Sequence, residues 1–112
     1  MLYIVGENEK GRAVFANYSI KKGHVIMTCP VLVFNAEKTA ILRETILDDY
    51  IFDWPSSNER IDSNEWTSSA VVLGDGSLLN HSSDPNAGWT INRSKNQVIY
   101  TAIRDISFFN VA

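Results

Sequence analysis

A short polar stretch in the C-terminal half of the chain carries the side chains best suited to bind a small molecule. Residues 73–87 read Leu-Gly-Asp-Gly-Ser-Leu-Leu-Asn-His-Ser-Ser-Asp-Pro-Asn-Ala, so two leucines lead into a run of short polar side chains. Asn and Ser hydrogen-bond to nearby backbone, and Pro85 fixes the turn that follows. Such a segment holds backbone amides and carbonyls in a rigid geometry that suits a flat heterocycle. On composition alone, an ordinary loop rich in Asn, Asp and Ser is the better explanation.

The histidines and the cysteine do not indicate a metal site. His24 and His81 are the two histidines and Cys29 is the one cysteine, which is too few ligands for a zinc centre. Cys29 lies in an apolar run, so a small buried side chain is a better interpretation than a nucleophile. A lone cysteine also forms no internal disulfide. We therefore predict that the chain binds no metal.

The composition is that of an ordinary folded protein and excludes several classes. The 112 residues, 45% hydrophobic and 21% charged, fit one domain over residues 1–112. The net charge of −3 argues against direct nucleic-acid binding, which favours a basic surface. No stretch approaches the roughly 20 apolar residues that span a bilayer, and residues 1–10 lack the pattern of a signal peptide. We expect an intracellular protein that does not bind membranes.

The apolar pattern predicts a mainly β fold with one or two short helices. Strands are predicted at residues 2–5, 12–16, 24–34 and 97–103, with a polar turn over residues 6–11. Pro30 is expected at a sheet edge or a bulge, because proline has no N–H to donate. Asn35 is expected to cap a helix over residues 36–47. Residues 48–54 look extended, and residues 68–73 fit a short helix or a strand equally well.

Residues 80–86 read Asn-His-Ser-Ser-Asp-Pro-Asn. This stretch resembles the Asn-His-Ser-Cys-x-Pro-Asn signature of SET-domain protein-lysine methyltransferases, with Ser83 where a cysteine is frequent. Other segments match the same family in the same order: residues 10–16, 20–23, 49–52 and 102–106. One short motif can arise by chance, whereas five ordered matches are specific. The chain is similar to small, single-domain SET proteins of the viral and bacterial type, whose fold has several small sheets.

The resemblance implies a site for S-adenosylmethionine. In the family, a glycine-bearing loop contacts this cofactor through backbone groups, and that role carries over to Gly11, Arg12 and Ala13. Ala13 stands where the family has a second glycine, so its Cβ narrows the approach of the backbone or forbids a positive φ. The signature's Asn-His pair contacts the cofactor by side chain and main chain, which assigns the same role to Asn80 and His81.

The resemblance also implies a narrow aromatic tunnel through which the target lysine reaches the methyl group. Tyr50 is the candidate tunnel residue, and a half-buried strand tyrosine is an equal alternative. Aromatic walls disfavour a charged ammonium, and ring faces favour a sulfonium or a methylated ammonium. Phe52 and Trp54 are interpreted as core residues, and no role is assigned to Trp66 or Trp89.

Two departures from the family pattern affect the expected fold. Ser83 replaces a cysteine that binds zinc in many members, which again predicts no metal. After Ile106 the sequence runs Ser-Phe-Phe-Asn-Val-Ala, without the family's Gly-Glu-Glu turn and without a tyrosine beyond Tyr100. We therefore expect the SET domain to be incomplete, with its C-terminal knot-forming strand and its catalytic tyrosine missing. The unpaired sheet edge left behind would favour a homodimer.

The function implied by the resemblance is S-adenosylmethionine-dependent N-methylation of a protein lysine. The reaction is an SN2 methyl transfer to the lysine ε-amine, and the substrate is a histone-like or other basic protein. One alternative is a catalytically inactive SET remnant that binds cofactor or peptide. Another is an unrelated, small β-rich interaction domain. The expected location is the cytoplasm, or the host nucleus if the protein is viral or an effector.

Overall fold

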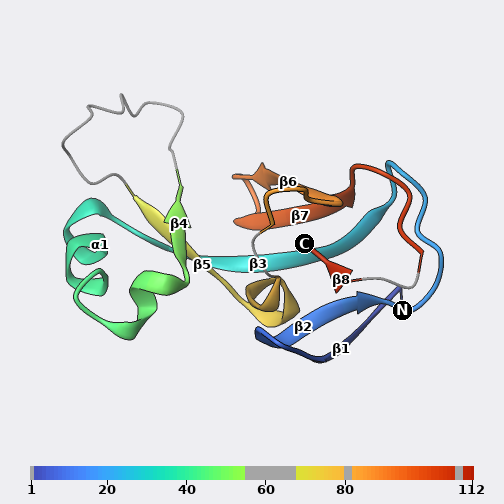
Figure 1. Ribbon diagram of the computed structural model, residues 1–112. Helices are drawn as coiled ribbons and strands as arrows, with labels where there is room; N and C mark the ends of the chain where they lie inside the picture. The colour runs from blue at the N-terminus through green and yellow to red at the C-terminus, as the bar shows by residue number, and fades with distance from the viewer. Residues whose placement is uncertain (1, 55–67, 80–81, 108–109) are drawn as a thin grey trace.

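The computed structural model describes residues 2–54, 68–79, 82–107 and 110–112 (Figure 1). The described residues form a three-stranded sheet in the order β1-β2-β8 and a five-stranded sheet in the order β4-β5-β3-β7-β6. The strands are β1 (Tyr3–Asn8), β2 (Gly11–Ala16), β3 (Val25–Phe34), β4 (Ile51–Asp53), β5 (Ser69–Val72), β6 (Ala87–Asn92), β7 (Gln97–Ala102) and β8 (Asn110–Val111). The same described residues also form an α-helix, α1 (Ala36–Leu42), and the 3-10 helices η1 (Ile46–Asp49) and η2 (Gly74–Leu78). The prediction of a mainly β fold with short helices is confirmed.

The first two strands form a tight antiparallel hairpin. Its register pairs Tyr3 with Ala16 and Asn8 with Gly11. Gly11 has a φ of +103°, a conformation that glycine adopts without steric cost. The predicted turn over residues 6–11 was too long, because β1 continues to Asn8. Polar residues near the hairpin end gain strand conformation from pairing with β2, which sequence composition does not report.

β3 is the central strand of the larger sheet and changes its partner halfway along. Its first half pairs with β7 and its second half with β5, and it crosses the middle of the molecule (Figure 1). Pro30 lies at the changeover, where its carbonyl accepts the Leu73 N–H at 2.9 Å. Each half of β3 is paired along one side, so the expected edge position of Pro30 agrees with the pairing. The irregularity in β3 lies between Val25 and Met27 instead.

Helix α1 begins at the predicted residue but is shorter than the predicted helix over residues 36–47. The Asn35 side chain accepts the Lys38 N–H at 2.9 Å and caps α1. The hydroxyls of Thr39 and Ser69, both 1% exposed, lie 2.7 Å apart, and their hydrogen bond joins α1 to β5. The helix ends at Leu42, because the Thr45 hydroxyl donates to the Leu42 carbonyl at 2.6 Å and caps η1. Residues 46–49 are therefore a separate 3-10 helix, and residues 69–72 are a strand.

Two strands in the C-terminal half were not predicted. β6 was interpreted as part of an irregular segment, yet it pairs with β7 along its whole length. β8 pairs with Val14 and Phe15 of β2, and Val111 is fully buried. The expectation that no C-terminal strand covers the first sheet was therefore wrong, and this part of the edge proposed for a homodimer is already paired.

The hydrophobic core lies between the two sheets. Its most deeply buried large side chains are Val14, Ile20, Val98 and Val111. Ile20 and Ile106 exchange two backbone hydrogen bonds of 2.7 Å, which fasten the segment after β2 to the segment after β7. Among the residues described, no helix has the length and apolar character needed to cross a membrane.

Candidate functional site

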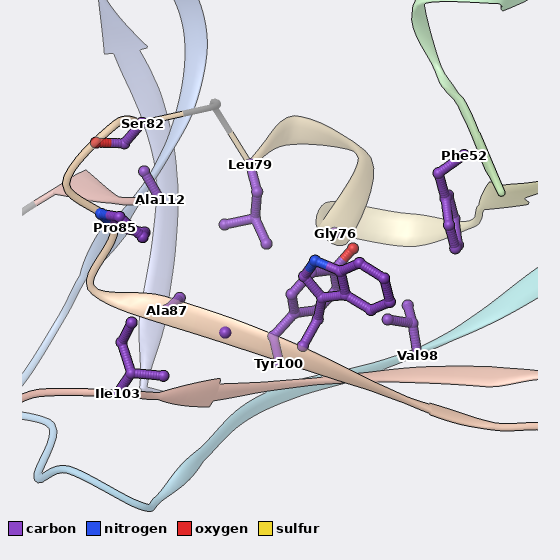
Figure 2. A pocket seen from close by; sticks show the side chains of 12 residues that line it. Phe52, Gly76, Leu79, Ser82, Pro85, Ala87, Val98, Tyr100, Ile103 and Ala112 are labelled. Atoms are coloured by element: carbon purple, nitrogen blue, oxygen red, sulfur yellow. The ribbon is translucent and has the colours of Figure 1, made fainter.

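A cavity of about 550 Å³ lies between β4, η2 and the β6–β7 hairpin. Figure 2 shows Phe52 on one side, with Leu79, Ser82 and Pro85 on the other and Tyr100 between them. Most of the lining is apolar, and a few polar groups reach its rim. A volume of this size and this kind of lining are typical of small-molecule sites.

Aromatic rings from opposite edges of the larger sheet meet at the cavity. The ring centroids of Phe52 and Trp89 lie 5.9 Å apart at 61°, an edge-to-face contact. β4 and β6 are the outer strands of the sheet order, so this contact shows that the sheet curls around the cavity. Trp54 extends the contact, with its ring 6.0 Å from that of Phe52. Trp89 stays 55% exposed and is open to a ligand.

Gly76 of η2 lines the cavity and packs closely against the larger sheet. A Cβ at this position would lie 2.8 Å from Tyr100, 2.9 Å from Cys29 and 2.9 Å from Val72. Glycine is therefore needed for η2 to pack directly on the sheet. Cys29 is buried, and burial raises the pKa of its thiol, which keeps the thiol protonated. Its interpretation as a small buried side chain is confirmed.

Two described residues of the signature segment, Ser82 and Pro85, lie at the cavity. Leu79 and Ser82, the described residues on either side of positions 80 and 81, both line it, as does Pro85. Asn80 and His81 themselves lie outside the described residues. After them, Arg104 donates to the Asp84 carboxylate at 3.1 Å and to the Asp84 carbonyl at 3.0 Å, which fixes the loop to the end of β7.

Asn86, the last residue of the signature, binds the C-terminal strand. Its side-chain amide donates to the Asn110 carbonyl at 2.8 Å and its side-chain oxygen accepts the Ala112 N–H at 2.9 Å. The backbone N–H groups of Asn86 and Ala87 donate to the Ala112 carbonyl at 2.9 and 3.0 Å. Asn86 is 8% exposed, and Ala112 lines the cavity. Sequence analysis assigned this side chain no role beyond its place in the motif.

Comparison with known families decides which fold this is. The sequence profile of the SET domain matches residues 11–108. The chain belongs to the SET domain family.

Individual relatives agree with this assignment. A histone-lysine N-methyltransferase of Schizosaccharomyces pombe, described as specific for H3 lysine-37, is 30% identical over 106 residues. That match covers 94% of this SET domain chain and 65% of the relative's length. A crystal structure from Plasmodium falciparum, of a candidate histone methyltransferase, is 27% identical with a TM-score of 0.67, covering 97% of this chain and 92% of that one.

A more distant solved structure supports the fold alone. The Neurospora SET domain protein DIM-5, a histone lysine methyltransferase, is 20% identical with a TM-score of 0.69. That match covers 96% of this chain and 49% of DIM-5. The prediction of a SET fold made of several small sheets is confirmed.

The predicted cofactor-binding residues of this SET domain take different positions in the hairpin. Gly11 starts β2 with its positive φ, Arg12 is exposed, and Ala13 is fully buried opposite Gly6. None of the three lines the cavity. The Cβ of Ala13 does not strain the backbone, because the φ of Ala13 is not positive and the residue lies in a regular strand. Their cofactor role stays a prediction.

The aromatic residues at the cavity are only partly those expected. Tyr50 follows η1, is 49% exposed and does not line the cavity. Phe52, interpreted from the sequence as core, does line it, together with Trp89 and Tyr100. The missed signal was the position of Phe52 at the end of the matching segment 49–52, within the short strand β4. Among the residues described, no three His, Cys, Asp or Glu side chains gather as a metal site.

Two tyrosines of this SET domain are expected to ionise only at unusually high pH. Burial raises the pKa of Tyr3 to about 12, helped by its hydrogen bond to Asp75, and burial raises the pKa of Tyr100 to about 12. The stabilisation linked to a raised tyrosine pKa is fully present below the ordinary pKa of about 10. It is lost as the pH rises through about 12. In an ultraviolet pH titration, Tyr3→Phe and Tyr100→Phe should each remove one phenol that ionises near pH 12. An unchanged curve for either variant would contradict the burial seen here.

Proposed function

We propose that this SET domain is an S-adenosylmethionine-dependent N-methyltransferase that acts on a lysine of a histone-like or other basic protein. One observation supports this most strongly. Leu79 and Ser82, which flank Asn80 and His81 in the sequence, line the same cavity as three aromatic side chains. Family membership removes the alternative of an unrelated β-rich interaction domain.

The proposal assigns the cofactor to two segments of the chain. Gly11, Arg12 and Ala13 would hold it through backbone groups, and Asn80 and His81 would hold it from the signature. η2, which leads into the signature, packs against β2, so the supports of both segments are in contact. When bound, S-adenosylmethionine supplies a methyl group that an amine takes by in-line displacement. The ring faces of the cavity would favour the positive charge of its sulfonium.

The cavity walls would prepare the substrate lysine for reaction. Phe52 and Trp89 form an apolar, aromatic wall, in which a charged ammonium is poorly solvated. Desolvation lowers the pKa of an amine and so favours the neutral, nucleophilic form. A narrow aromatic space also limits the orientations of the lysine side chain, and orientation contributes a large part of the rate in such reactions. Tyr50, at the C-terminal end of η1, would then contact the substrate outside the cavity.

The proposal is tested by methyl transfer to a mixture of core histones, with modified lysines identified by mass spectrometry. The wild-type chain should transfer methyl groups to lysine. Trp89→Ala, a change at a half-exposed cavity residue, should reduce transfer at least about tenfold through loss of orientation. Tyr18→Ala is the matched control, because Tyr18 is 63% exposed and does not line the cavity. Asn80→Ala should also reduce transfer.

The outcomes separate the remaining alternatives. Cofactor binding without transfer to any basic protein would support an inactive SET remnant and reject the enzyme. Equal transfer by the wild type and Asn80→Ala would remove the role assigned to Asn80. Equal transfer by Trp89→Ala and Tyr18→Ala would show that the lysine does not enter this cavity.

A further inference from the structure

A hydrogen bond between residues far apart in the sequence joins the first sheet to the cavity wall. The Tyr3 hydroxyl donates to the Asp75 carboxylate at 2.8 Å across 72 positions of sequence. Tyr3 begins β1, and Asp75 lies in the first turn of η2. Both side chains are partly buried. A hydrogen bond to a carboxylate in such a place is stronger than one between neutral groups.

η2 is held from two directions at adjacent residues. Gly76 packs against Cys29, Tyr100 and Val72 so closely that no Cβ fits. On the other side, Asp75 is bound by Tyr3. The contacts of Gly76 therefore fix the distance between η2 and the larger sheet. The hydrogen bond between Tyr3 and Asp75 fixes the position of η2 relative to the β1–β2 hairpin. A shift of η2 along the hairpin would break this bond first.

η2 and Leu79 form a part of the cavity wall. Leu79, directly after η2, lines the cavity, and Asn80 and His81 follow in the sequence. The hairpin that carries Tyr3 also carries Gly11, Arg12 and Ala13. We propose that Tyr3, through Asp75, is a positioning residue that holds the cavity wall formed by η2 and Leu79 in place against this hairpin. This inference rests on the proposed function, and no contact between Tyr3 and the cofactor is implied.

The test is calorimetric binding of S-adenosylmethionine to the full chain. Tyr3→Phe and Asp75→Leu should each weaken binding about tenfold, the effect of one charge-assisted hydrogen bond. Asp75→Asn keeps an acceptor oxygen but loses the charge, so its affinity should lie between that of the wild type and that of Asp75→Leu. The double variant Tyr3→Phe/Asp75→Leu should bind no more weakly than either single variant, because both remove the same bond.

A second readout separates positioning from general instability. Tyr18→Phe is the matched control, since Tyr18 is 63% exposed, and it should not change affinity. Hydrogen exchange should speed up at the amides of residues 74–79 in Tyr3→Phe, with no change in β7. Wild-type binding together with unchanged affinity in Tyr3→Phe would overturn the positioning role alone. Failure of the folded wild type to bind the cofactor would overturn the proposed function and this inference with it.

Discussion

Gly76→Ala is expected to abolish most methyl transfer and to destabilise the fold. The new Cβ would lie within 2.9 Å of Tyr100, Cys29 and Val72, and overpacking of this kind costs about 1–3 kcal/mol. Alanine also restricts the unfolded chain, which returns about 0.4–1 kcal/mol. The net loss of stability should therefore be modest. The displacement of Tyr100 into the cavity should reduce activity far more, by at least about a hundredfold, because small misplacements strongly affect rate.

The measurement pairs urea unfolding with the histone assay. Gly88→Ala is the matched control, because Gly88 also lines the cavity but its Cβ would meet a single atom, the terminal Ile103 Cγ2, at 2.8 Å. That side chain can turn away, so the control should keep more activity than Gly76→Ala. If Gly76→Ala retains wild-type transfer, η2 does not form a wall of the active site.

Asn86→Asp is expected to give the largest loss of stability, about 2–3 kcal/mol. The carboxylate has no N–H, so the bond to the Asn110 carbonyl is lost and two oxygens face each other at 2.8 Å. The oxygen that accepts the Ala112 N–H is retained. One of the two side-chain hydrogen bonds therefore remains, and the loss of stability is attributed to the missing N–H donor. β8 should detach from β2 before the rest of the fold unfolds.

Asn92→Asp is the control with the same charge change. Within the described part of the chain, the hydrogen bonds of the Asn92 side chain are those that its oxygen accepts from Ser94 and Lys95, so an aspartate replaces it at little cost. The free energy of unfolding, measured with urea for both variants, should fall only for Asn86→Asp. Equal effects would mean that added charge, rather than the lost donor, destabilises the chain.

The sequence predicted the family and the outline of the fold because local patterns were sufficient for both. The spacing within residues 80–86 and the order of the other matches depend on backbone geometry that the family shares. Asn35 was correctly predicted as a cap, since its hydrogen bond to the Lys38 N–H is three residues away. Cys29 was correctly placed in the interior from its apolar neighbours.

The errors occur where partners distant in sequence decide the structure. β6 contains Gly88 and ends at Asn92, residues typical of turns, yet pairing with β7 makes it a strand. The helix was extended past Leu42 because residues 43–47 favour helices, and the Thr45 cap overrode this preference. Phe52 packs against the core as expected, but its place at the cavity was missed. Its contact with Trp89 depends on the curl of a sheet whose outer strands are at least 34 positions apart in sequence, from Asp53 to Ala87. No local pattern reports such a curl.

The claim on which this account depends is that the reacting methyl group lies in the aromatic cavity. S-adenosylmethionine labelled with ¹³C at its methyl group, added to the chain, allows nuclear Overhauser effects from that methyl to be measured by NMR. We expect contacts to ring protons of Phe52, Trp89 or Tyr100, each removed by substituting that ring. Saturable binding in which the methyl contacts none of these rings would contradict the account.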